Sequence, residues 1–171
     1  MIHVYYGEGK GKTTAAAGLA LRALGNGLSV LFLQFMKARA SGEITRFSAL
    51  SGIAVLRNSI DCGFYRNMTE AQKTQMTRMH NENIEKVFAL LDKGCDLLVL
   101  DEVFSAYEYN LLDKSMVRQL YGMAENNQFE LVLTGRRPDA VFIQGADYIT
   151  EMKKERHPFD RGVSARQGIE Y

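Results

Sequence analysis

The feature that most constrains this chain is the stretch GEGKGKTT, residues 7–14, which lies between the apolar run IHVYY and the alanine-rich run TTAAAGLALRAL. It matches the phosphate-binding pattern G-x-x-x-x-G-K-[ST] at Gly11, Lys12 and Thr13, but the first position of the pattern falls on Tyr6. A strand before the loop and a helix after it are the context that such a loop requires, because its N–H groups and the helix N-terminus bind an anion together. The sequence therefore predicts a nucleotide-phosphate site with an unusual first residue.

Short apolar runs alternate with longer helical patterns along the chain, which is the rhythm of a mostly parallel sheet with helices on both faces. The runs IHVYY, SVLFLQF and DLLVL are nearly all apolar, as strands covered on both sides should be. We expect one α/β domain over residues 1–171. Strands are expected at residues 2–6, 29–35, 53–58, 96–103, 130–136 and 148–152, and helices at 13–27, 69–91, 114–126 and 138–145.

Three segments lack a clear period. Residues 36–52 have room for one short helix, residues 58–67 read as irregular, and the tail at 153–171 shows no regular pattern. Irregular segments of this length in a compact domain are usually functional or disordered.

Composition excludes several classes of protein. A net charge of +1 gives no reason to expect nucleic acid or an anionic membrane as partner, and no apolar run approaches the ~20 residues that cross a bilayer. Because the first strand is expected to begin at Ile2, we expect no signal peptide and a cytoplasmic protein. Cys62 and Cys95 lack metal-ligand spacing and are expected to be reduced thiols.

The run LLVLDEV supplies a second element of a nucleotide site. A hydrophobic strand that ends in Asp101 and Glu102 places an acid beside the loop, where it contacts Mg²⁺ directly or through water. Together with the hydroxyl of Thr13, these two acids form the predicted metal site. From the residues alone, the chain is a P-loop nucleotide-binding enzyme; kinase, NTPase motor, and nucleotidyl or adenosyl transfer all remain open.

The segments GEGKGKTTAA, LQFMK, CGF, LDEV, LTGR and ERHPFDRGVSARQGIEY, taken together, resemble the P-loop family of corrinoid adenosyltransferases. The resemblance runs in register over nearly the whole chain, and the unusual first position of the loop is itself a feature of that family. It implies a P-loop NTPase fold of the RecA-like type, with MgATP and a reduced corrinoid as substrates. It also implies an electron donor such as a reduced flavoprotein, and a homodimer.

In that family the Co(I) of the corrinoid attacks the ribose 5′-carbon of ATP, and triphosphate leaves as one unit. The resemblance implies that ATP is bound in a reversed sense along the loop, so that the 5′-carbon and not the γ-phosphate is exposed. No general base is needed, because Co(I) carries its own electron pair. His3, His80 and His157 are accordingly expected to have structural or exposed roles.

The expected site residues fall into three groups. Lys12 and Phe64 are the expected catalytic residues, the first at the triphosphate and the second below the cobalt, and Tyr65 is expected beside Phe64 at the corrinoid. Thr13, Asp101 and Glu102 are the expected Mg²⁺ ligands. The expected ATP contacts are Gly7, Glu8, Gly9, Lys10, Gly11, Lys12, Thr13, Thr14, Arg22 and Arg136.

The corrinoid segment departs from the family at one position. Well-known members read G-F-x-W, where apolar aromatics strip the lower ligand from cobalt and make Co(I) accessible; here the segment is Gly63, Phe64, Tyr65 and Arg66, and the chain has no tryptophan. Phe64 carries over, Arg66 stands in the place of the tryptophan, and Tyr65 is the candidate substitute.

Two rival functions come from other classes. One is a P-loop kinase or RecA-like ATPase, and the other is a module that binds ATP and corrinoid without turnover. The phosphate product separates all three: triphosphate for adenosyl transfer, ADP for a kinase or ATPase, and no product for a binding module.

Overall fold

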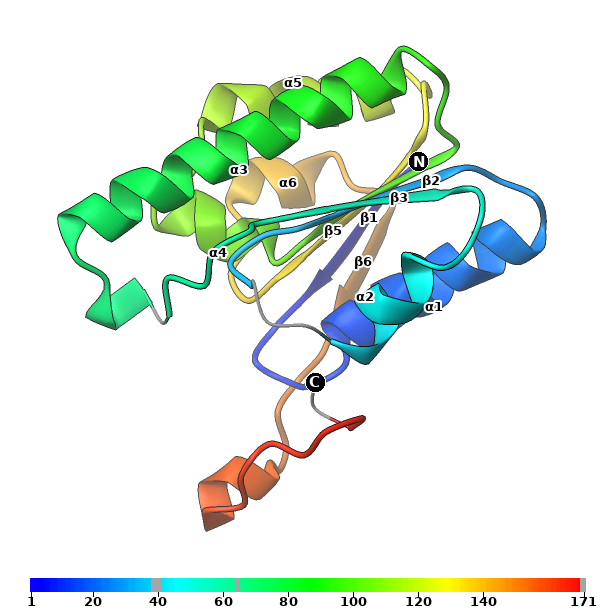
Figure 1. The fold of residues 1–171 in the computed structure, drawn as a ribbon. Coiled ribbons are helices and arrows are strands. Elements are labelled where there is room, and N and C mark those ends of the chain that lie inside the picture. The colour runs from blue at the N-terminus through cyan, green and yellow to red at the C-terminus, as the bar shows by residue number, and fades with distance from the viewer. Residues whose placement is uncertain (38–40, 64, 170–171) are drawn as a thin grey trace.

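The computed structural model describes residues 1–37, 41–63 and 65–169, and its centre is a six-stranded sheet (Figure 1). The strands are β1 (Ile2–Tyr6), β2 (Val30–Gln34), β3 (Ile53–Arg57), β4 (Leu97–Asp101), β5 (Glu130–Gly135) and β6 (Tyr148–Glu151). Their order across the sheet is β3-β2-β4-β5-β1-β6, and every pairing is parallel. The expected α/β class is confirmed, and the sheet is fully parallel rather than mostly so.

Helices cover both faces of the sheet. One face carries α1 (Lys12–Gly25) and α2 (Gly42–Phe47); the other carries α3 (Glu70–Leu91), α4 (Val103–Glu108), α5 (Lys114–Glu125) and α6 (Ala140–Gln144) (Figure 1). Two buried apolar clusters follow from this division. Phe32, Val99 and Val132 pack with the alanines of α1, whereas Leu33, Leu100 and Leu133 pack with the helices of the opposite face. Successive side chains of a strand point to opposite faces of the sheet, so alternate residues of each strand pack into different apolar clusters.

Two helices begin at a residue whose side chain bonds to the backbone of the first turn. The Thr69 hydroxyl accepts from the Gln72 N–H while the Gln72 side chain accepts from the Thr69 N–H, so α3 begins at a capping box. The Asp113 carboxylate accepts from the Ser115 N–H and begins α5 in the same way. Both starts are set by short-range chemistry that is visible in the sequence.

One expected strand is too long. The strand expected at residues 96–103 ends at Asp101, because Glu102 takes the left-handed conformation (φ 61°) and α4 begins at Val103. The expectation was wrong because Val103, after the two acids, is apolar like the strand before them, and a short apolar stretch does not distinguish a buried strand from a buried helix.

The irregular segments contain three short elements. The short helix expected within residues 36–52 is α2, and the 3₁₀ turns η1 (Tyr65–Asn67) and η2 (Pro158–Arg161) lie in residues 58–67 and in the tail. The tail leaves the carboxyl end of β6 and extends away from the sheet (Figure 1). Cys62 and Cys95 are both free thiols. No helix in the described parts of the chain is long and apolar enough to span a bilayer.

Candidate nucleotide and corrinoid site

The glycine loop connects the carboxyl end of β1 to the start of α1. Tyr6, which holds the first position of the pattern, is the last residue of β1 and pairs with Gly135 on one side and Glu151 on the other. The chain leaves the strand at Gly7 (φ +111°) and enters α1 through Gly11 (φ +117°), conformations that favour glycine. Tyr6 is therefore an ordinary strand residue and the left-handed turn falls on Gly7, so the position of Tyr6 does not require glycine.

The loop is pressed against the end of β6. A Cβ at Gly7 would lie 2.6 Å from the carbonyl oxygen of Met152, and one at Gly9 would lie 2.5 Å from the same atom. The Gly9 N–H donates to that oxygen at 2.6 Å, and the Met152 N–H donates to Tyr6 O at 2.7 Å. These two glycines allow backbone to approach backbone, which is a different requirement from the left-handed turn at Gly11.

Lys12 turns back over the loop from the first residue of α1. Its ammonium donates to Gly7 O at 2.7 Å and to Gly9 O at 2.6 Å. Burial lowers the pKa of Lys12 from its usual value, and the nearby carboxylate of Glu102 opposes this shift. A positive charge is thus held at the mouth of the loop by backbone carbonyls.

Asp101 is fully buried at the carboxyl end of β4, where α1 and the two neighbouring strands supply hydrogen-bond donors. It receives bonds from Thr13 Oγ1 (2.9 Å), Gln34 Nε2 (3.0 Å) and Thr134 Oγ1 (2.7 Å). Gln34 pairs in register with Asp101, and Gln34 and Thr134 each come two residues after an apolar member of the cluster under α1. Strand alternation therefore puts the three polar side chains on the face that meets the loop.

Glu102 makes the turn after β4. Its N–H donates to Thr134 Oγ1 at 2.9 Å, and its carboxylate accepts from the Ser105 hydroxyl at 2.8 Å. Asp101 alone of the two acids bonds to Thr13, whereas Glu102 contributes its charge near Lys12. The two expected metal ligands thus have different surroundings.

Two arginines follow β5 on the outer side of the loop. Arg136 donates to the Glu8 carboxylate at 2.7 Å, and Arg137 lies between Glu8 (3.9 Å) and Glu108 at the end of α4 (3.5 Å). The two arginine side chains are largely exposed, and those of Glu8 and Glu108 are partly exposed. Arg137 was missed from the sequence, although it directly follows Arg136 in the segment LTGRR.

The remaining expected ATP contacts lie at different distances from the loop. Lys10 and Thr14 are exposed on the loop and on the first turn of α1. Arg22 is exposed in the last turn of α1, ten residues after Lys12, which corresponds to about 15 Å along the helix axis. The structure therefore does not bring Arg22 to the glycine loop.

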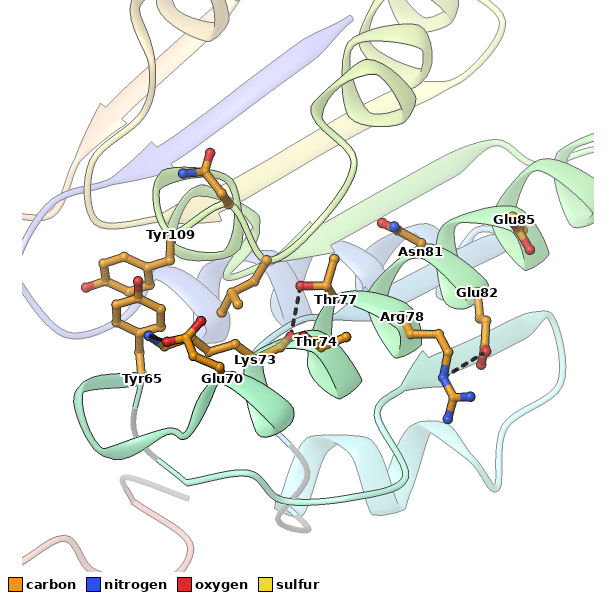
Figure 2. A pocket seen from close by; sticks show the side chains of 12 residues that line it. Tyr65, Glu70, Lys73, Thr74, Thr77, Arg78, Asn81, Glu82, Glu85 and Tyr109 are labelled. Carbon is orange, nitrogen blue, oxygen red and sulfur yellow. Dashed lines mark hydrogen bonds and ion pairs between the residues drawn. The ribbon is translucent and has the colours of Figure 1, made fainter.

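The segment expected to meet the corrinoid lies at η1. Phe64 is outside the described residues. The ring of Tyr65 stacks on that of Tyr109 with centroids 4.0 Å apart and an interplanar angle of 3°, and the Lys73 ammonium lies 5.0 Å from the Tyr65 centroid (Figure 2). This pair stands at one end of a groove of about 790 Å³ that continues along the polar surface of α3 (Figure 2). Tyr109 had no signal in the sequence, because it is 44 positions away in the chain and follows a helix that was not expected.

The glycine loop after β1 is joined to the buried Asp101 at the end of β4 by the hydrogen bond from Thr13. A loop and an acid in this arrangement define the class of P-loop nucleotide-binding proteins. Sequence comparison gives its branch: the chain matches, over residues 1–171, the family described as ATP:corrinoid adenosyltransferase BtuR/CobO/CobP. It belongs to that family, and the activity of the family is transfer of the adenosyl group from ATP to a corrinoid.

Curated relatives with the name corrinoid adenosyltransferase agree with this assignment. A protein from Pseudomonas aeruginosa is 34% identical over 98% of this chain and 82% of its own length. One from Escherichia coli is 32% identical over 100% of this chain and 85% of its own length, and one from a Sinorhizobium species is 30% identical over 100% and 80%.

Proposed function

We propose that the chain transfers the 5′-deoxyadenosyl group of MgATP to the Co(I) of a corrinoid by direct displacement. The electron pair of Co(I) forms the new Co–C bond at the 5′-carbon, and the C5′–O bond breaks with its pair leaving on triphosphate. Cobalt is formally oxidised from Co(I) to Co(III), and no proton moves. The observation that carries the proposal is the loop joined to Asp101 through Thr13, in a chain of this family.

The loop would then bind the leaving group rather than a phosphate under attack. Negative charge grows on the triphosphate as the C5′–O bond breaks, so positive groups fixed beforehand lower the barrier. Lys12 supplies an ammonium at the mouth of the loop, and α1 supplies free N–H groups at its start. Arg136 supplies a guanidinium, which would exchange its bond to the Glu8 carboxylate for one to the phosphates.

The residues around Asp101 fit a magnesium ion. Mg²⁺ prefers oxygen ligands and is usually bound by one or two carboxylates together with substrate phosphates. Thr13 and Asp101 offer a hydroxyl and a carboxylate in contact, and the side-chain amide oxygen (Oε1) of Gln34 beside them is buried without a hydrogen-bond partner. Within the described ranges no cluster of three His, Cys, Asp or Glu side chains could hold a metal, which agrees with an ion bound largely by ATP. When bound, the ion neutralises the departing triphosphate.

The corrinoid would lie against the aromatic end of the groove. A flat macrocycle needs a broad apolar surface with scattered polar partners. The stacked pair of Tyr65 and Tyr109 offers such a surface, and the polar side chains of α3 continue from it. Phe64, next to Tyr65 in the chain, is proposed as the residue that excludes the lower cobalt ligand. In this arrangement Tyr109 supplies the second aromatic ring that the tryptophan supplies in well-known members of the family.

Three further properties belong to the same proposal. A reduced flavoprotein is the proposed electron donor, because Co(II) must gain one electron before it can attack carbon. We further propose a homodimer in the cytoplasm. Sedimentation of the purified protein tests the dimer, and reduction by a flavoprotein in place of a chemical reductant tests the donor.

The deciding experiment identifies the phosphate product. The enzyme is given MgATP and a corrinoid that has been reduced chemically to Co(I), and phosphate products are separated by ion exchange while the Co–C bond is followed by its absorbance. Triphosphate and adenosylated corrinoid in equal amounts support the proposal, with Lys12→Ala as the inactive control. ADP in place of triphosphate would show a kinase or ATPase, and ATP left intact would show a binding module.

A further inference from the structure

Lys37 is held at the nucleotide site by a fixed stretch of backbone. The Phe35 N–H donates to Asp101 O at 2.9 Å, the Met36 N–H donates to His80 Nε2 at 3.3 Å, and the Lys37 N–H donates to Phe35 O at 2.7 Å. Met36 takes a left-handed conformation (φ 59°) that turns the chain at this point. These bonds fix where the side chain of Lys37 begins.

The ammonium of Lys37 contacts Thr13 and Asp101, two of the residues proposed to bind Mg²⁺. Its Nζ lies 3.2 Å from Thr13 Oγ1 and 3.5 Å from Asp101 Oδ2. The Thr13 hydroxyl donates its own proton to Asp101, so it is a lone pair of Thr13 that accepts from Lys37. Among the residues that the structure describes, Lys37 is the one that forms an ion pair with Asp101.

A magnesium ion and Lys37 cannot hold these oxygen atoms at the same time. Mg²⁺ binds oxygen at 2.0–2.1 Å, so an ion on Thr13 and Asp101 would lie close to the Lys37 ammonium and would repel it at short range. Asp101 is fully buried, whereas the Lys37 side chain is 42% exposed. The lysine is therefore the group that can move.

We propose that Lys37 is a place-holding cation, which neutralises Asp101 while the site is free of nucleotide and moves to the triphosphate when MgATP brings its metal to Thr13 and Asp101. The inference rests on the proposed MgATP site and adds a residue to it. A buried carboxylate without a cation is costly, and the exchange keeps one beside Asp101 in both states. The Lys12 ammonium, by contrast, bonds to the loop carbonyls of Gly7 and Gly9 and not to Asp101.

Metal binding to the nucleotide-free protein tests the first half of the proposal. Mn²⁺ replaces Mg²⁺ as the probe, and free Mn²⁺ is measured by electron paramagnetic resonance. Lys37→Met removes the competing charge, so we expect Mn²⁺ to bind about tenfold more tightly, while Lys37→Arg stays near the parent protein. Lys154→Met is the matched control, because Lys154 is 40% exposed and forms an ion pair with Asp160. Mn²⁺ affinity that is unchanged or lower in Lys37→Met overturns the proposal.

Binding of inorganic triphosphate tests the second half. Calorimetry at saturating Mg²⁺ should show that Lys37→Met binds triphosphate about tenfold more weakly, with no change in Lys154→Met. Equal affinities in Lys37→Met and the parent protein would overturn the movement to triphosphate. These readings need no catalysis, so failure of the proposed adenosyl transfer, seen as the wrong product from the parent enzyme, is told apart from failure of this inference.

Discussion

Thr13 and Asp101 are 88 positions apart in the chain, yet the hydroxyl of the first donates to the carboxylate of the second at 2.9 Å. This bond joins the first turn of α1 to the end of β4 and passes over β5, which lies between β4 and β1 in the sheet. The glycine loop and the acidic strand therefore act as one site, and changes on either side should have linked effects.

Asp101→Asn and Glu102→Gln should change the magnesium requirement unequally. Asp101 contacts Thr13, whereas Glu102 bonds to Ser105 at the turn. We expect Asp101→Asn to raise the Mg²⁺ concentration for half-maximal activity on the order of tenfold or more, and Glu102→Gln to raise it less. Titration of the adenosylation rate against Mg²⁺ measures both. Equal shifts would contradict the separate roles, and two unmoved curves would remove the metal site from these acids.

Substitution of two glycines near the loop should have opposite effects on stability. A Cβ at Gly9 would meet Met152 O at 2.5 Å and Lys153 O at 2.8 Å, so Gly9→Ala should cost about 1–3 kcal/mol and weaken nucleotide binding. Gly18 lies exposed in α1 with nothing within 4 Å of an added Cβ, so Gly18→Ala should stabilise by about 0.5–1 kcal/mol. Urea unfolding gives both values. A neutral Gly9→Ala would mean that the loop is free to move away from β6.

His80 should make stability fall with acid. The ring is buried, with Nδ1 at 2.7 Å from Leu111 O, and burial lowers its pKa from 6.5 to about 4. Between these two values the unfolded chain binds the proton and the folded chain does not. Stability is therefore full above pH 6.5 and falls as the pH drops through this window, by about 3 kcal/mol in total.

The matching variant is His80→Gln, which cannot titrate. It should be less stable than the parent at pH 8, but the difference should shrink as the pH falls toward 4. Urea unfolding of both proteins at several pH values isolates the contribution of His80, because the carboxylates titrate in both. If the stability of the two proteins changed in parallel with pH, the ring of His80 would have the same pKa in the folded and the unfolded protein.

Phe64→Ala should slow the enzyme more when it starts from Co(II) corrinoid than from prereduced Co(I). Loss of an apolar wall lets water or the nucleotide base bind the lower face of Co(II), which then accepts an electron less readily. Co(I) has little affinity for axial ligands, so its attack depends on ATP placement. Lys12→Ala should lose activity equally from both starting states. If Phe64→Ala lost the same share of activity from Co(II) and from Co(I) corrinoid, Phe64 would have no specific role in the reduction of cobalt.

The sequence predicted well those parts of the site that depend on neighbours in the chain. The glycine loop, the start of α3 at Thr69 and the acid at the end of β4 all follow from local patterns. Gln34, Thr134 and Lys37 were missed because their meeting at Asp101 depends on the order of strands β2, β4 and β5, which no single segment encodes. The contact between Tyr65 and Tyr109 was missed for the same reason.

Arg22 was assigned to the site from the resemblance alone. A resemblance gives a residue its position in an alignment, but the helix decides where the side chain lies, and Arg22 is ten residues after Lys12, the first residue of α1. Whether ATP reaches it depends on how the nucleoside extends from the phosphates. Its expected contact with ATP remains a prediction.

Tyr6 shows how a motif written in letters differs from a motif written in dihedral angles. The pattern asks for glycine at the position of Tyr6, but that residue is ordinary strand, and the angle that only glycine holds easily occurs at Gly7. A search that insists on the first letter would pass over this chain, whereas one that asks for a left-handed residue at the end of a strand would find it. Tyr6→Gly would therefore loosen the end of the strand without restoring a missing turn.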